Sequence, residues 1–167
     1  GYVSANFSAW GGFATTILLI VMFIGGCGGS TTCGIKVFRL QVLASTAKVQ
    51  ISRLLRPHAV VLAYYNKRPV SVEVMDSVMG LFYLFILGFV LIAIMLGIAG
   101  LDFVTALSGA ATSISNVGPG LGEVIGADGN FSTLPDSAKW IMTFAMLLGR
   151  LEIFTVLVML NPAFWQR

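Results

Sequence analysis

The stretch that decides the fold is FVTALSGAATSIS at residues 103–115, followed directly by NVGPG at residues 116–120. Asp102 stands in front of it as a helix N-cap. Thirteen residues of helix span roughly 20 Å at 1.5 Å per residue, which is too short for a hydrocarbon core of about 30 Å. A short apolar helix that stops in glycine and proline is typical of a re-entrant helix.

Longer apolar segments lie on both sides of this short helix. Residues 77–101 carry no charge and predict a membrane-spanning helix with some tilt. Residues 137–162 predict a second spanning helix, with Trp140 and Trp165 as interfacial anchors. The expected order is therefore a helix over 77–101, a pore helix over 102–115, a filter loop over 116–120 and a helix over 137–162.

The composition supports a membrane environment. Of the 167 residues, 57% are hydrophobic and 10% are charged, whereas soluble domains carry about 25% charged residues. We therefore predict an all-α, multi-pass membrane protein with a potassium-channel-like helix–pore-helix–helix repeat. The apolar start at Gly1 leads us to expect a piece of a larger polypeptide. No nucleophile–base pair or paired carboxylate set is visible, so an enzyme is not expected.

A glycine-rich segment interrupts the first apolar run. Residues 13–24 are strongly apolar, and residues 25–34 then contain five glycines in ten positions. Glycine costs a helix about 1 kcal/mol per residue, so the helix should break here. Unpaired backbone groups at membrane depth are tolerated only inside protein or beside a watery cavity. A broken transmembrane helix is therefore predicted, with its break at a functional place.

The charges are distributed unevenly along the chain. Residues 36–76 hold seven basic and two acidic residues, a net charge of +5, whereas residues 102–139 hold four acidic residues and one basic residue, a net charge of −3. The positive-inside rule places the first segment in the cytoplasm and the 116–120 loop toward the outside. This uneven distribution argues against nucleic acid as a partner. Residues 57–76 are either a solvated basic connector, with a weak hairpin signal at Asn66–Pro69, or a surface that docks a partner.

The loop at 116–120 has the composition of a cation filter. Glycines let backbone carbonyls turn toward an ion and replace its lost water. The candidate ligands are the carbonyl oxygens of Asn116, Val117 and Gly118, with Pro119 completing the turn. The motif alone is equally typical of an ordinary turn, and only its place after a re-entrant helix favours a filter.

Arg150 lies near the middle of the last apolar segment, where a charged side chain normally faces protein or water. One interpretation is an ion pair with another element. Glu152 is not the natural partner, because residues two apart do not face each other on a helix. The alternative is that Arg150 faces the ion path as a positive barrier and meets the segment at 25–34. Cys27 and Cys33 are interpreted as small packing residues.

Several motifs together resemble the C-terminal portion of the membrane subunit of the Trk potassium-uptake transporters, in the superfamily that includes the Ktr and HKT proteins. These motifs are GGCGGST at 25–31, GIKV at 34–37, RPVS at 68–71, GLDF at 100–103, NVGPGLGE at 116–123 and LGRLE at 148–152.

The resemblance implies a four-repeat pore, working as a homodimer in a bacterial cytoplasmic (inner) membrane. Residues 1–56 would then hold the second helix of repeat three, with Gly1 as its filter glycine, and residues 77–167 would form repeat four, with Gly118 as its filter glycine. The gate would be the loop at 25–34 with Arg150. The partners would be the other repeats, the lipid bilayer and a cytosolic nucleotide-binding regulatory subunit, docked on the basic connector. The gate residues implied are Gly25, Gly26, Gly28, Gly29, Ser30, Thr31 and Arg150.

The function expected on this basis is transport of potassium, with sodium as a second candidate ion and no covalent cofactor. K+ would bind at the backbone carbonyls of Asn116, Val117 and Gly118. The alternative is a non-conducting membrane scaffold or assembly subunit, whose re-entrant helix only packs.

Overall fold

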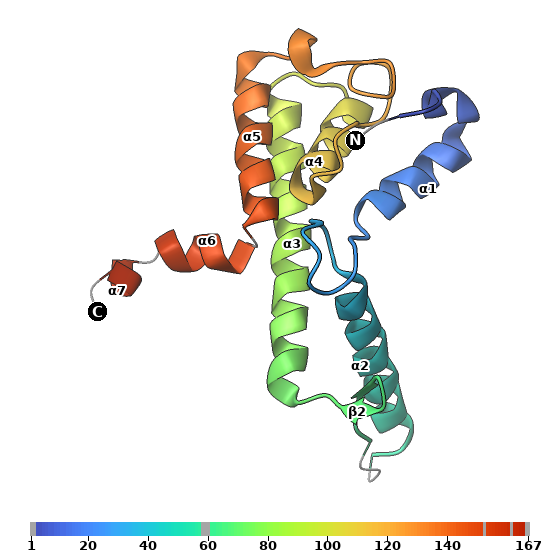
Figure 1. The fold of residues 1–167 in the computed structure, drawn as a ribbon, viewed down its shortest axis with the longest axis vertical. Coiled ribbons are helices and arrows are strands. Elements are labelled where there is room, and N and C mark those ends of the chain that lie inside the picture. The colour runs from blue at the N-terminus through green and yellow to red at the C-terminus, as the bar shows by residue number, and fades with distance from the viewer. Residues whose placement is uncertain (1–2, 58–60, 152, 161, 166–167) are drawn as a thin grey trace.

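The computed structural model describes residues 3–57, 61–151, 153–160 and 162–165. Gly1, Glu152 and His58 lie outside these ranges. A long helix, α3 (Val72–Ile98), forms the axis of the molecule (Figure 1). Helices α4 (Phe103–Ser115) and α5 (Asp136–Arg150) pack against one part of it, and α2 (Val37–Leu55) packs beside another part. Helix α1 (Gly12–Met22) approaches α4 from the other side, after the 3-10 helix η1 (Phe7–Trp10).

Helix α3 is the one helix among the described residues that is long and apolar enough to cross a membrane. It begins at Val72, five residues before the predicted start at residue 77. Ser71 precedes it in extended conformation, and Glu73 lies in the first turn, where the helix dipole favours a negative charge. The connector between α2 and α3 is therefore shorter than the predicted 57–76, because residues 72–76 are helical.

A helix, α4, is present where the pore helix was predicted over 102–115, and it forms the centre of the core. Asp102 caps it, with its Oδ2 accepting a hydrogen bond from the Thr105 amide at 3.1 Å. From Thr105 to Ser115 every residue except Leu107 is buried. Small residues such as Gly109 and Ala110 let α3 and α5 approach its backbone closely. This short apolar helix is therefore enclosed by protein.

The predicted helix break in the first apolar run is also present. Helix α1 ends at Met22, and the chain does not return to helix until Val37, where α2 starts. Between them, residues Ile24 and Ile35 form a parallel bridge. The chain thus leaves α1 and returns to nearly the same place before α2 begins.

The weak hairpin signal corresponds to a very short hairpin. Strands β1 (Tyr64–Tyr65) and β2 (Arg68–Pro69) pair in antiparallel fashion. Asn66 and Lys67 form the turn, both with positive φ (49° and 63°), as a type I′ turn requires. The hairpin is shorter than its flanking sequence suggested, because the residues from Val72 onward belong to α3.

The prediction of one continuous helix over 137–162 is wrong. Helix α5 ends at Arg150, and a separate helix, α6 (Ile153–Leu160), points away from it (Figure 1). A four-residue helix, α7 (Pro162–Trp165), follows. No glycine or proline stands between residues 150 and 160, so the local sequence carries no break signal. Gly149 and Arg150, the last two residues of α5, both make tertiary contacts, described below.

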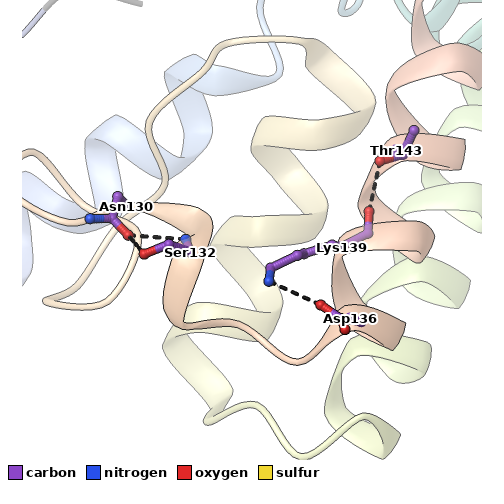
Figure 2. Close-up of polar contacts among 5 residues, drawn as sticks. All are labelled: Asn130, Ser132, Asp136, Lys139 and Thr143. Atoms are coloured by element: carbon purple, nitrogen blue, oxygen red, sulfur yellow. Dashed lines mark hydrogen bonds and ion pairs between the residues drawn. The ribbon is translucent and has the colours of Figure 1, made fainter.

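The return from the filter loop to α5 is held by short-range polar contacts (Figure 2). The Asn130 side chain accepts hydrogen bonds from the Ser132 amide and hydroxyl at the start of the 3-10 helix η2 (Phe131–Thr133). In the first turn of α5, Lys139 Nζ lies 3.1 Å from Asp136 Oδ1. These exposed contacts are local and lie at and just before the start of α5.

Candidate functional site

The filter segment (residues 116–120) is tied to the last turn of α4 by its backbone amides. The Val117 amide donates to the Thr112 carbonyl at 3.0 Å, and the Gly118 amide donates to Thr112 Oγ1 at 3.0 Å. Asn116 has left-handed backbone angles (φ 52°, ψ 44°), and Gly118 has φ 115°. Such angles turn the chain sharply out of the helix and favour glycine at position 118.

The carbonyl groups of the filter segment are bonded differently from its amides. Within the part of the chain that the structure describes, the carbonyl oxygens of Asn116, Val117 and Gly118 accept no hydrogen bond. Three successive peptide oxygens without a protein donor are a chemically suitable surface for a hard monovalent cation. The predicted filter residues Asn116 to Pro119 are therefore contiguous and backbone-anchored, whereas Gly1 lies outside the described residues.

The glycine loop (residues 25–34) is closed by its own backbone. The Gly25 amide donates to the Ile35 carbonyl and the Ile35 amide to the Phe23 carbonyl, both at 2.9 Å. A Cβ on Gly25 would lie 2.4 Å from the Cys33 carbonyl oxygen, so only glycine fits there. Gly29 and Gly34 have positive φ values of 84° and 80°. The two ends of the loop are thus held together by backbone hydrogen bonds, and the Ser30 amide donates to the Cys27 carbonyl at its tip.

Within the loop, the predicted gate residues differ in how closely they are packed. Gly26 lies so close to Ser30 and Thr32 that a Cβ would approach their hydroxyl oxygens to 2.8 and 2.9 Å. Gly28 is less constrained, since a Cβ there would meet only the Phe38 ring at 3.4 Å. Ser30 Oγ donates to the Cys27 carbonyl at 2.9 Å. Gly26 and Ser30 therefore hold the tip of the loop together.

The expected packing of Cys27 is not seen within the described residues. The Cys27 side chain is exposed, because residues 27–30 form a turn at the tip of the loop, whereas Cys33 is half-buried. Both are free thiols.

Arg150 reaches the glycine loop. Its Nη1 donates to the Thr31 carbonyl at 2.5 Å and lies 3.9 Å from Cys33 Sγ. A guanidinium that donates to a carbonyl forms a charge-assisted hydrogen bond. The expectation that Arg150 and the loop meet is confirmed. Glu152 lies outside the described residues. Among the described residues, the recorded partners of the Arg150 side chain are the Thr31 carbonyl and Cys33 Sγ, both in the glycine loop.

Two cavities lie on either side of the loop. The filter cavity, of about 370 Å³, is lined by α1, by Thr32 and Cys33, and by residues 115–117 of the filter region. The arginine cavity, of about 240 Å³, is lined by Ser30, Thr31, Arg150 and the side of α3. Thr32 and Cys33 line both cavities. This part of the loop therefore forms a wall between the space under the filter and the space around Arg150.

Three contributors to the site were missed in the sequence. Thr112 caps the filter amide, Gly149 allows α5 to approach α4, and the Asn116 side chain donates from Nδ2 to the Met146 carbonyl at 3.0 Å. A Cβ on Gly149 would lie 1.9 Å from the Ile114 carbonyl oxygen. The available signal was a glycine directly before a charged residue in an apolar helix, which indicates close helix packing.

The fold defines a class of protein: an all-α membrane protein built on a helix–pore-helix–helix unit. A family model described as TrkH, cation transport protein, matches residues 1–167. The chain therefore belongs to the TrkH cation transport protein family.

Individual relatives agree with this assignment. The Trk system potassium uptake protein TrkI of Halomonas elongata is 47% identical over the whole chain, and TrkH of Escherichia coli K12 is 36% identical over 99% of it. The crystal structure of the potassium transporter TrkH from Vibrio parahaemolyticus superposes with a TM-score of 0.89 at 39% identity, covering 99% of this chain and 35% of that one. The chain spans about a third of the length of these relatives, 34% for both curated sequences.

Proposed function

We propose that the full-length protein containing this chain conducts potassium, with sodium as a second candidate, inward across a bacterial cytoplasmic membrane. The names of the relatives support potassium as the transported ion. The observation that carries the proposal is the open carbonyl face of Asn116, Val117 and Gly118, whose neighbouring amides are tied back to Thr112. Fixed peptide oxygens of this kind replace the water that an ion loses when it enters a filter.

The glycine loop and Arg150 act as the gate in this proposal. The loop separates the filter cavity from the arginine cavity, so an ion leaving the filter meets the loop next. The Arg150 charge, held against Thr31, adds an electrostatic barrier to cations in a region of low dielectric constant. Opening then requires the bond from Arg150 to Thr31 to break or the loop to move with it.

The assembly is proposed from the family resemblance. Residues 1–56 contribute the second helix of repeat three, and residues 77–167 contribute repeat four of a four-repeat pore that forms a homodimer. The exposed basic side chains of α2 and the hairpin, Lys48, Arg53, Arg56, Lys67 and Arg68, form a docking surface for a cytosolic nucleotide-binding regulatory subunit.

The filter assignment is tested by Gly118→Ser in the full-length protein, reconstituted in vesicles and assayed for uptake of labelled rubidium in competition with sodium. The added side chain at φ 115° strains the backbone and rotates the filter carbonyls, so the preference for rubidium over sodium should fall. Gly100→Ser is the matched control, because Gly100 also has positive φ (92°) but open space around it. Equal selectivity in the two variants would remove the filter assignment.

The rival function is a non-conducting scaffold. It predicts no rubidium uptake by the wild-type protein in any state, with or without a cytosolic activator. Uptake that depends on the protein and is blocked by excess potassium would exclude the scaffold.

A further inference from the structure

The end of α5 contacts the filter segment and the glycine loop at the same time. The Met146 carbonyl accepts a hydrogen bond from Asn116 Nδ2 at 3.0 Å, and Gly149 lies against the Ile114 carbonyl. One residue further on, Arg150 Nη1 donates to the Thr31 carbonyl. Residues 146 and 150 are one helical turn apart, which is about 6 Å along the axis. One rigid turn of helix therefore holds both candidate elements of the pore.

The two hydrogen bonds meet α5 one turn apart, at the carbonyl of Met146 and at the side chain of Arg150. In an α-helix the carbonyl of residue 146 accepts from the amide of residue 150, and α5 remains helical through Arg150. The Met146 carbonyl thus faces both the Asn116 side chain and the backbone of the residue that holds the loop. A displacement of Arg150 that pulls on its own backbone changes the position of this carbonyl.

Asn116 is also the residue through which such a displacement reaches the filter. Its left-handed backbone is the C-cap of α4, and the following residue, Val117, carries a candidate ion ligand. The α4 side of this junction is rigid, because Thr112, Ser113 and Ile114 are fully buried. A force on the Asn116 side chain therefore acts on the orientation of the 116–117 and 117–118 peptide groups rather than on α4.

We propose that Asn116 is a positioning residue that couples the filter to the gate, through its side-chain hydrogen bond to Met146. The inference rests on the proposed function and deepens it. When Arg150 holds the loop, the Asn116 amide holds the filter carbonyls in one orientation. When α5 moves on gating, the filter carbonyls are released, so the affinity of the filter for an ion depends on the state of the loop.

The expected size of the coupling follows from the bond that carries it. A neutral hydrogen bond changes an equilibrium by about two- to tenfold. Loss of the Asn116 bond should therefore change the open fraction of the loop by about two- to tenfold.

The test uses the full-length protein with Cys33 as its one reactive cysteine, after Cys27→Ser and removal of any cysteines elsewhere. Cys33 is half-buried beside Arg150 on the wall between the cavities, so its rate of modification by a small methanethiosulfonate reagent reports loop position. Asn116→Gly keeps the left-handed backbone and removes the amide, whereas Asn116→Asp keeps the shape and removes the donor. Both should change the Cys33 modification rate by about two- to tenfold and alter rubidium selectivity.

Thr112→Val is the matched control, since it removes a filter hydrogen bond of the same 3.0 Å length that does not involve α5. It should alter selectivity and leave the Cys33 rate unchanged. In an Arg150→Ala background, Asn116→Gly should no longer change the rate. The coupling would be overturned by any one of three results. The Cys33 modification rate could be unchanged in both Asn116 variants, it could change equally in Thr112→Val, or the effects of Asn116→Gly and Arg150→Ala on it could be fully additive. Absence of rubidium uptake by the wild-type protein would instead refute the proposed function, because the labelling comparison does not depend on flux.

Discussion

Gly149→Ala is the sharpest perturbation of this site, because it moves α5 without changing any group that contacts an ion. The added Cβ would lie 1.9 Å from the Ile114 carbonyl oxygen and 2.9 Å from Asn116 Nδ2. The Ile114 carbonyl belongs to the buried helix α4 and has no freedom to retreat. Helix α5 must therefore withdraw by about 1.1 Å (3.0 − 1.9) to reach the shortest separation that real Cβ atoms show.

The withdrawal acts on the bond that holds the loop. If the whole shift falls on the contact from Arg150 Nη1 to the Thr31 oxygen, the distance grows from 2.5 Å to about 3.6 Å, which is beyond a hydrogen bond. A hydrogen bond to a charged group contributes about 1.5–3 kcal/mol, so its loss changes the closed-to-open ratio of the loop by about 10- to 150-fold. Overpacking adds a stability cost of about 1–3 kcal/mol, which the helix preference for alanine offsets by about 1 kcal/mol.

The assay is rubidium leak into vesicles that hold the full-length protein without its activator, together with the thermal unfolding midpoint. Gly149→Ala should raise the leak and leave the unfolding midpoint unchanged or lower. Gly97→Ala is the control, because a Cβ on Gly97 in α3 meets nothing within 4 Å. If both variants show the same leak and the same midpoint, the packing argument for α5 is refuted.

Three further predictions concern the loop and the helix cap. Arg150→Ala should raise rubidium leak by removing both the barrier charge and the bond to Thr31, and leak at the wild-type level would make Arg150 a structural residue. Gly25→Ala should disrupt the glycine loop, because the added Cβ would lie 2.4 Å from the Cys33 carbonyl oxygen. Gly12→Ala is the control and should leave the loop intact, because a Cβ on Gly12 meets nothing within 4 Å. The rate of limited proteolysis within the loop compares the two variants. Asp102→Ala should lower the free energy of unfolding by about 1 kcal/mol through loss of the N-cap, whereas Asp102→Asn should retain most of it. Hydrogen bonding from the Thr105 side chain, and then from backbone amides, lowers the pKa of Asp102 despite the opposing effect of burial. The stability that the ionised Asp102 carboxylate contributes is therefore complete above the ordinary carboxyl pKa and is lost as pH falls through the lowered pKa. An unfolding midpoint that does not change with pH in this range would contradict the prediction.

The sequence by itself determined the features that depend on neighbouring residues. The apolar run before Asp102 predicts α3, the carboxylate of Asp102 predicts the start of α4, and the glycines at 25–34 predict the end of α1. Each of these signals lies in one continuous stretch of chain and acts through a backbone preference, a cap or an apolar run long enough to span a membrane. For this reason the short helix α4, the turn that follows it and the break after α1 could all be predicted without coordinates.

Only the tertiary structure decided how the filter segment and the glycine loop are both joined to α5. The bond from Arg150 to Thr31 spans 119 residues and the bond from Asn116 to Met146 spans 30. No glycine or proline follows Arg150 before residue 160, and α5 ends beside the close contact of Gly149 with the Ile114 carbonyl. Contacts of this kind depend on where separate helices cross, and the crossing is set by the packing of small side chains on α4, which no local pattern encodes.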